Sequence, residues 1–553
     1  MARICTVSLI AAFVLAGCTT VTEIPPLPYP EQVLQAKTED VVDVAALADS
    51  FVEEQMSAEL LQELAQFELE TRAFSDRKLP LGPLGTAILD RCYISLVGHT
   101  AMAEFYEHLG EQQATVHRDW IESITRYIAE DRDGSRDDPY KVFTKPQAET
   151  FLENDGFRVL GSYYDGVPET PLLLAVLVEK DSTQSETVFF DFSATFDELA
   201  SLVNVPENSE DADKRNYVMY FLASQGDSAA QASMGSLLAQ LGRTQEARRW
   251  LTAAIHGGNA YAHLITARMF VARASRGRES SRPTYLSWAH GHYNDAVEAG
   301  LDPAIRELGM LLIQGDFGER AIEEGIAYLE RAAQQDDVPA LITLARMAYS
   351  GENQGQPDFE RAATFYEQAA RIGGSPVRVE YFRFLADSNT PLRATRQSFD
   401  WLEEAADSGS AEAMVEIGNC HARGCLDKPN YRKAKSWYRR AVRAASENPS
   451  VVNEVAWTMT VSHIDSLRSP RYARRIMDQM MENSELARQQ PEFLDTWAAA
   501  YAATGDFEKA VELQHQALRV AQSNRTLPQE HLKAIKAHLE SFSKGEAVLK
   551  PIP

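Results

Sequence analysis

Three side chains able to bind a metal ion or form a covalent bond lie close together in the C-terminal half of the chain: Cys420, His421 and Cys425. A structural zinc site needs four ligands and usually includes a C-x-x-C pair, and this group has neither. His290 and His292 are two residues apart, which on a helix points them to different sides. We therefore predict no metal ion and no other cofactor.

Acidic side chains raise a second chemical interpretation, because paired carboxylates can hydrolyse glycosidic bonds. Asp165, Glu169, Asp191 and Asp197 fall in one segment, but their spacing alone does not bring two of them together. The sequence contains no H-E-x-x-H, G-x-S-x-G, Walker phosphate loop or dinucleotide-type glycine motif. We interpret these carboxylates as solvated surface, predict no catalytic residue and expect the protein not to be an enzyme.

The N-terminus has the pattern of an export signal. After the cationic start at Arg3, residues 4–14 form an apolar run too short to span a bilayer comfortably. The run closes on Leu-Ala-Gly-Cys, residues 15–18, which resembles the lipobox of bacterial lipoproteins. That resemblance implies removal of residues 1–17 as a signal peptide, acylation of Cys18 and, with Thr19 next, an outer-membrane position facing the periplasm. The alternative is a plain secretory signal with an incidental cysteine.

The remaining thiols are then Cys92, Cys420 and Cys425. The periplasm is oxidising, so Cys420 and Cys425 are candidates for a local disulfide at the turn that follows a helix. Two small buried side chains are the equally open alternative. Residues 18–37 should form the acylated cysteine and an extended tether, because four prolines between residues 25 and 30 oppose a helix.

The formal charge of −26 argues against nucleic acid as a partner of the whole molecule. Two groups of basic residues stand out against this background as candidate anion- or partner-binding sites. The first should lie in a long connection, Arg268, Arg273, Arg276 and Arg278. The second follows helical spacing of three and four, Arg432, Lys435, Arg439 and Arg443, opposite the Trp437/Tyr438 face. The alternative for both is a solvated or salt-bridged surface.

These residues must be positioned by a unit of two helices that recurs along the chain. Its clearest copy is Ala411–Ala445, with one apolar face ending near Gly424 and a second carrying Trp437 and Tyr438. One such pair cannot bury both of its faces, so it needs neighbours. About seven copies precede a last one that begins at Asp495.

The pattern A-x-x-x-L-G, a glycine-containing connection and then K-A-x-x-W-Y-x-x-A-A resembles the Sel-one-like repeats, a subclass of tetratricopeptide-like repeats. It implies a mainly α protein, a right-handed α-α superhelical solenoid of helix pairs. We expect Sel-one-like repeats over residues 227–491, a tetratricopeptide-like repeat over 492–524 and a capping helix over 525–545.

The N-terminal half differs from this pattern. Residues 38–139 read as helical, with long helices over 38–73 and 84–109 and a further one up to residue 130. Residues 140–204 contain three β-rich runs, 157–164, 172–178 and 187–192, flanked by helices, which predicts a small α+β module.

Together these features predict a lipid-anchored periplasmic scaffold that binds partner proteins in an envelope assembly. By architecture it also resembles the lipoprotein of the alginate-export machinery, which implies a scaffold in exopolysaccharide export with anionic polysaccharide as a partner. A third hypothesis makes the α+β module a ligand-binding or enzymatic domain carried on the repeats. Arrays of helical repeats bind many unrelated partners, so the predicted fold does not distinguish among these three functions.

Overall fold

The computed structural model describes residues 29–38, 43–74, 77–166, 170–180, 185–203, 211–318, 320–352, 355–445, 448–523 and 527–550. The predicted signal peptide, Cys18 and most of the predicted tether lie outside these residues. Within the described ranges, no helix combines the length and the apolar character that crossing a membrane requires. The chain divides into two compact units, one of residues 1–269 and 298–300 and one of residues 270–297 and 301–553.

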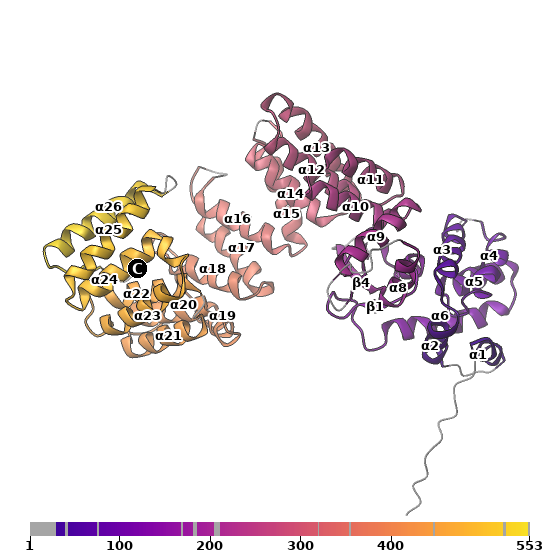
Figure 1. Ribbon diagram of the computed structural model, residues 1–553, viewed down its shortest axis with the longest axis horizontal. Coiled ribbons are helices and arrows are strands. Elements are labelled where there is room, and N and C mark those ends of the chain that lie inside the picture. Colours follow the sequence, from indigo (N-terminus) through magenta and orange to yellow (C-terminus); the bar gives the residue numbers. More distant parts are fainter. Residues whose placement is uncertain are drawn as a thin grey trace, which may run out of the picture. The chain divides into compact units, whose positions relative to one another are not determined.

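The first unit begins with six helices (Figure 1): α1 (Tyr29–Ala36), α2 (Val44–Glu54), α3 (Ala58–Ala73), α4 (Leu81–Leu89), α5 (Leu96–Leu109) and α6 (Gln113–Ala129). Residues 29–36, expected in the tether, are helical, because proline is tolerated in a first turn and Tyr29 has a buried place. The single long helices expected over 38–73 and 84–109 are each two helices. Ser57 and Ser95 interrupt them by capping α3 and α5.

The predicted α+β module is present and has one more strand than expected. Strands β2 (Arg158–Asp165), β3 (Leu173–Glu179) and β4 (Ser185–Asp191) form the antiparallel meander, and β1 (Tyr140–Lys141) adds to β4 in parallel. The order is therefore β1-β4-β3-β2, with β3 central and almost wholly buried. Helices α7 (Lys145–Asn154) and α8 (Ser193–Ser201) flank the sheet, and Thr144 caps α7 through the amide of Gln147.

The module is not a separate domain, because it shares one apolar core with the N-terminal helices and the first repeat. This core runs from Tyr29 and Phe51 through Phe190 to Met234. The outer edge of β2 is closed by side chains of the first repeats. Asn259 exchanges two hydrogen bonds with the backbone of Ser162, at 3.2 and 2.7 Å, and Ser233 Oγ accepts from Tyr164 N at 2.8 Å. An edge strand left open would invite pairing with another chain.

A buried carboxylate ties the helical region to the module. Glu68 on α3 accepts hydrogen bonds from Ser95 Oγ, 2.7 Å away, and from Thr144 Oγ1, the two hydroxyls that cap α5 and α7. Burial, with the two hydrogen bonds opposing it, raises the pKa of Glu68 to about 7. One ionisable group therefore joins three helices.

Helix pairs fill the rest of the chain. Helix α9 (Asp211–Ser224), which the sequence did not predict, precedes them and contacts both α8 and the first pair. The pairs are α10 (Ser228–Gln240) with α11 (Thr244–His256), α12 (Tyr261–Arg276) with α13 (Arg282–Glu298), α14 (Asp302–Gln314) with α15 (Ile322–Gln334), α16 (Val338–Ser350) with α17 (Phe359–Ile372), α18 (Ser375–Ala386) with α19 (Arg396–Asp407), α20 (Ala411–Arg423) with α21 (Tyr431–Ala444), α22 (Pro449–Val461) with α23 (Pro470–Asn483) and α24 (Pro491–Ala503) with α25 (Phe507–Ser523). Helix α26 (Gln529–Ser543) packs on α25 as the expected cap.

In the second unit each second helix contacts the first helix of the next repeat, from α15 with α16 through to α23 with α24. First helices also contact one another, α18 with α20, α20 with α22 and α22 with α24. The predicted fold, a mainly α array of helix pairs with a small α+β module in the N-terminal half, is confirmed.

Within a pair, a small residue on the first helix lets the second approach closely. A Cβ added at Gly418 on α20 would lie 2.5 Å from the ring of Tyr438 on α21, and one at Gly235 would lie 2.5 Å from Leu251. Tyr438 is fully buried and donates a hydrogen bond to Asn419 Oδ1 at 2.7 Å. Trp437, predicted on the same apolar face, is only partly buried.

We expect Gly418→Ala to lower stability by about 1–3 kcal/mol, because the added methyl group overpacks the contact with Tyr438. The matched control is Gly291→Ala on α13, an exposed glycine with no atom within 4 Å of its added Cβ. That control should raise stability by about 0.5–1 kcal/mol through helix propensity. Thermal unfolding followed by circular dichroism measures both; equal effects would contradict the packing account.

The stability of the protein should depend on pH through Glu68. Its folded pKa of about 7 lies above its ordinary value of 4.5, so the folded state binds the extra proton. Stability from this group is present below pH 4.5 and is lost as the pH rises through 7. Glu68→Gln should therefore gain a few kcal/mol relative to wild type between pH 5 and 8, measured as the difference in thermal midpoints. Glu63→Gln on the exposed side of α3 should show no such trend.

Candidate functional site

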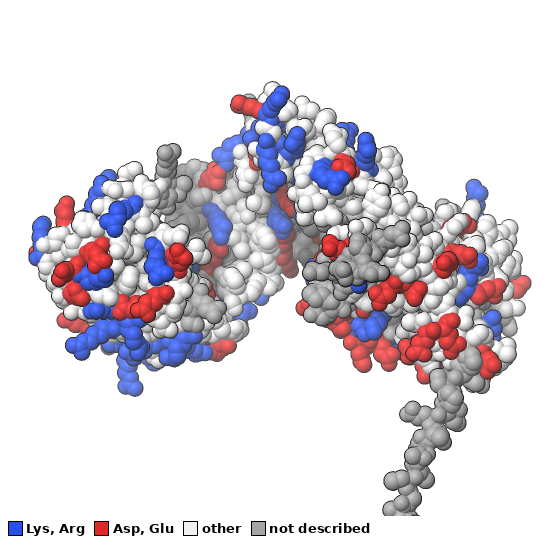
Figure 2. Space-filling model, viewed as in Figure 1, with Lys and Arg blue, Asp and Glu red and all other residues white. Residues whose placement is uncertain are grey.

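The second predicted basic group forms a surface on two neighbouring second helices. Arg432, Lys435, Arg439 and Arg443 lie along α21, and Arg471 and Arg475 lie on α23. The guanidinium groups of Arg439 and Arg475 lie 5.4 and 5.2 Å from the ring centre of Tyr472. We call these six residues the α21–α23 basic face. Figure 2 shows Lys and Arg gathered along the lower edge of the C-terminal repeats, where Figure 1 places these two helices.

The six cations differ from neighbouring arginines in their ion pairs with described residues. Among the residues that the structure describes, no Asp or Glu oxygen lies within 4.0 Å of their side-chain nitrogens. By contrast, Arg440 on α21 lies 3.0 Å from Asp407, and Arg474 on α23 lies 3.8 Å from both Asp478 and Asp506. Salt bridges within the described residues therefore do not cover this face, and the solvated surface remains the open alternative to a binding site.

The first basic group is not in a long connection as predicted. Helix α12 continues to Arg276, so Arg268, Arg273 and Arg276 are helical and only Arg278 lies in the connection to α13. The apolar face of Tyr261–Ala274 extends the helical pattern through this stretch, with Leu264, Phe270 and Ala274 buried. Arg273 lies 6.0 Å from the ring centre of Tyr285, and Arg282 pairs with Asp316 at 3.1 Å.

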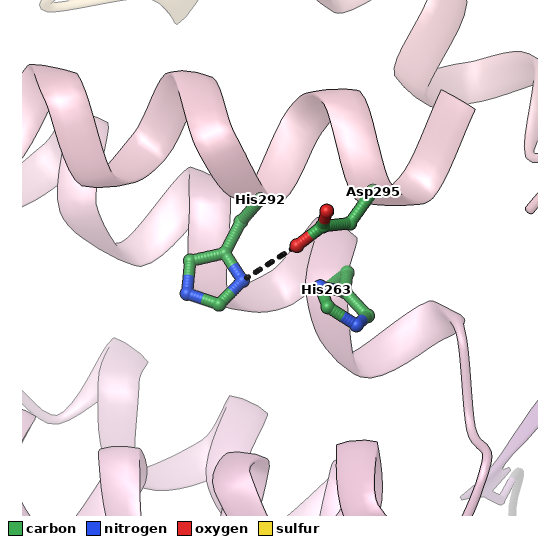
Figure 3. A group of neighbouring side chains, drawn as sticks. All are labelled: His263, His292 and Asp295. Carbon is green, nitrogen blue, oxygen red and sulfur yellow. Dashed lines mark ion pairs between the residues drawn. The ribbon is translucent and has the colours of Figure 1, made fainter. Parts of the chain in front are cut away.

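The two histidines of α13 differ in their surroundings, and the ligand atoms of His292, His263 and Asp295 lie within 4.8 Å of one another, close enough to hold a metal ion. The ring of His290 stacks on Phe317 with centres 4.8 Å apart. His292 Nδ1 lies 4.0 Å from an oxygen of Asp295, one turn along the same helix (Figure 3). His292 also stacks on Phe270, with ring centres 5.9 Å apart.

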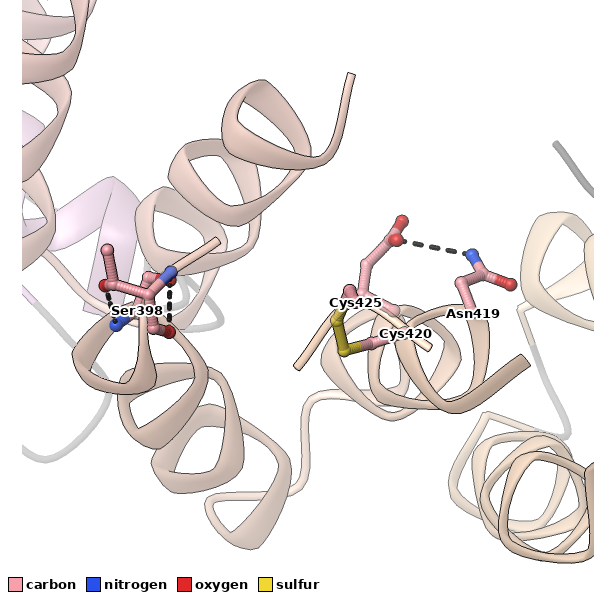
Figure 4. Close-up of a disulfide and its surroundings, with 6 residues drawn as sticks. Ser398, Asn419, Cys420 and Cys425 are labelled. Carbon is pink, nitrogen blue, oxygen red and sulfur yellow. Dashed lines mark hydrogen bonds between the residues drawn. A yellow bond between two sulfur atoms is a disulfide. The ribbon is translucent and has the colours of Figure 1, made fainter. Parts of the chain in front are cut away.

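Cys420 and Cys425 are joined by a disulfide at the end of α20, with their Cα atoms 5.1 Å apart (Figure 4). Gly424 reverses the chain there with a φ of +76°, a conformation that favours glycine. The amides of Gly424 and Cys425 both donate to Cys420 O, at 2.8 and 3.1 Å. Cys92 is a buried free thiol, so it contributes no second bridge within the described residues.

Sequence reasoning missed a buried polar group between repeats. Glu416 on α20 is 5% exposed, accepts from Arg383 Nε on α18 at 2.6 Å and accepts from Asn419 Nδ2 at 3.2 Å. Burial, followed by the charge of Glu416, raises the pKa of Glu454 on α22. Arg346 and Glu380 repeat the link one unit earlier. An Arg–Glu spacing close to the repeat length was the signal, and its role here is to join repeats.

Part of the array matches a known family of helical repeats. The Sel1 repeat family model matches residues 302–337, 339–374, 392–410 and 411–446. These four stretches of the array are therefore Sel1 repeats. The predicted resemblance is thus confirmed for these helix pairs, and α22 to α25 continue the same packing beyond the matched residues.

Solved structures of Sel1-repeat proteins are similar to the chain at low identity. A Sel1 repeat protein from Oxalobacter formigenes is 22% identical, covering 45% of this chain and 99% of its own, with a TM-score of 0.33. The antigen c5321 of uropathogenic Escherichia coli is 14% identical, covering 88% and 95%, with a TM-score of 0.30. A search of curated proteins found no match.

We expect Cys420 and Cys425 to resist alkylation in denaturant until a reductant is added, whereas Cys92 should react in denaturant alone. Replacing both bridged cysteines by alanine should cost about 2 kcal/mol, the entropy of a short closed loop. Alkylation followed by peptide mass mapping checks the first expectation and thermal unfolding the second. Labelling of Cys420 and Cys425 without a reductant would contradict the bridge.

Proposed function

We propose that this protein is a lipid-anchored scaffold of the bacterial cell envelope that binds partner proteins through its Sel1-repeat array. The array is the observation that carries the proposal: successive helix pairs present protein surface, and the described buried Glu416 links one repeat to the next through Arg383. Sel1-repeat arrays are scaffolds suited to protein–protein interaction, and such scaffolds are generally not enzymes.

The anchor in this proposal rests on residues 15–18, where the lipobox pattern makes Cys18 the acylation site. An outer-membrane position facing the periplasm follows from Thr19. The disulfide between Cys420 and Cys425 supports an oxidising compartment, since such bonds rarely persist in a reducing cytosol.

A second candidate is a scaffold in exopolysaccharide export. The α21–α23 basic face favours it, because uronate carboxylates would pair with guanidinium groups. The third hypothesis, a carried ligand-binding or enzymatic module, loses its premise of an independent domain. The strands share their core with the helices around them, and the first repeats close the edge of β2.

Acylation gives a direct test. In detergent phase separation of cells expressing the full chain, wild-type protein should enter the detergent phase, and its mass should show loss of residues 1–17 and gain of acyl chains. Cys18→Ser should enter the aqueous phase. Cys5→Ser is the matched control, because that residue would be discarded with the signal peptide, and it should behave as wild type.

An aqueous wild-type protein that retains its N-terminal residues would contradict the anchor. The scaffold is tested separately, by pull-down of wild-type protein from crosslinked envelopes. Repeated recovery of no protein partner would contradict it.

A further inference from the structure

We propose that the α21–α23 basic face binds a carboxylate-rich segment of a partner protein. This proposal rests on the proposed scaffold function and names the surface and the chemistry by which it holds one partner. It does not depend on the lipid anchor.

The α21–α23 basic face carries six positive charges that described carboxylates do not pair with. Arg432, Lys435, Arg439, Arg443, Arg471 and Arg475 have no described carboxylate within 4.0 Å, although the chain carries 80 Asp and Glu against 54 Lys and Arg. Holding six cations together costs repulsion that an anionic partner relieves. The neighbouring Arg440 and Arg474 are paired, so the surrounding helices do carry carboxylates where the cations need them.

Two guanidinium groups of the basic face lie against the same aromatic ring. Arg439 and Arg475 both lie near the ring of Tyr472. This contact limits the conformations of their planar guanidinium groups before a partner binds. Five of the six cations are arginines, and an arginine fork pairs with a carboxylate through two hydrogen bonds. Preorganised forks lose less entropy on binding than free lysine side chains.

The size of the face sets the size of the ligand. Arg432 and Arg443 are eleven residues apart on α21, a distance of about 16 Å along a helix axis. Packed helices lie about 8–10 Å apart, so the face is two helices wide. A surface recess of about 520 Å³ lies beside it, lined by Arg439, Arg471, Tyr472 and Thr504. These dimensions fit a short run of several carboxylates.

The distribution of charge favours a short segment over a long polyanion. The first unit holds 20 Lys and Arg against 42 Asp and Glu, and the second holds 34 against 38. Charges are screened over about 8 Å at physiological salt, so a short segment meets mainly the local basic face. A long anionic polymer would also meet carboxylates elsewhere on the second unit, which holds 38 Asp and Glu. The protein-binding character of Sel1-repeat arrays points the same way.

The test uses the full-length protein in neutral detergent and a fluorescein-labelled peptide of ten glutamates, with binding followed by fluorescence anisotropy at 20–200 mM salt. We expect binding at low salt that Arg439→Glu/Arg443→Glu weakens at least tenfold. The matched control is Arg331→Glu/Arg371→Glu on α15 and α17, which removes two exposed arginines of the same unit that belong to neither predicted basic group and makes the same change in net charge. It should stay within twofold of wild type.

Circular dichroism shows whether each variant is folded. Arg475→Lys, which keeps the charge but loses the fork, should weaken binding by a smaller factor. Absence of peptide binding at 20 mM salt would overturn the proposal, as would equal weakening by both double variants.

Competing occupants give distinct results in the same assay. Tighter binding of a polyuronate oligomer, or of vesicles containing phosphatidylglycerol, than of the peptide would overturn a protein partner in favour of that ligand. Self-association in sedimentation that Arg439→Glu/Arg443→Glu abolishes would assign the face to a second copy. Because acylation is measured separately at Cys18, failure here leaves the anchor intact.

Discussion

The array depends on one packing constraint: a helix pair has more apolar surface than it can bury alone. Its inner contact is made by a small residue on the first helix against a large one on the second, as at Gly418 and Tyr438 or Gly235 and Leu251. Its outer apolar surface is then covered by the next pair, and from α15 onward each second helix contacts the following first helix. Buried links such as Arg383 with Glu416 fix one repeat against the next.

The same constraint explains how the array begins and ends. At the start, the first repeats contact the α+β module, where Ser233 and Asn259 satisfy the backbone groups of the β2 edge. At the end, α26 covers α25, and His538 on α26 bonds to the buried Asp495 on α24 at 2.9 Å. A helix pair exposed at either end would leave an apolar face in water.

The sequence predicted best where a pattern repeats. The helix pairs, the final cap and the three main strands follow from apolar periodicity, because each is set by burial of its own residues. Prediction failed where the outcome depends on tertiary contacts. The break at Ser95 needs the capping hydroxyl and Glu68 together, β1 is two residues long, and α12 continues past Arg268 because its apolar side is buried. For the basic residues the sequence supplied the spacing on α21 and further arginines after it, but the approach of Arg439 and Arg475 to the same ring, Tyr472, required the fold.

The central claim is that this scaffold holds a protein partner through the α21–α23 basic face. Photo-crosslinking in intact envelopes tests it most directly, with a photoreactive amino acid placed at residue 443 and, as a control, at residue 371 on α17. The account predicts a discrete protein adduct from residue 443, crosslinked through a segment rich in Asp and Glu, and no such adduct from residue 371. No adduct from residue 443, or the same adducts from both positions, would contradict it.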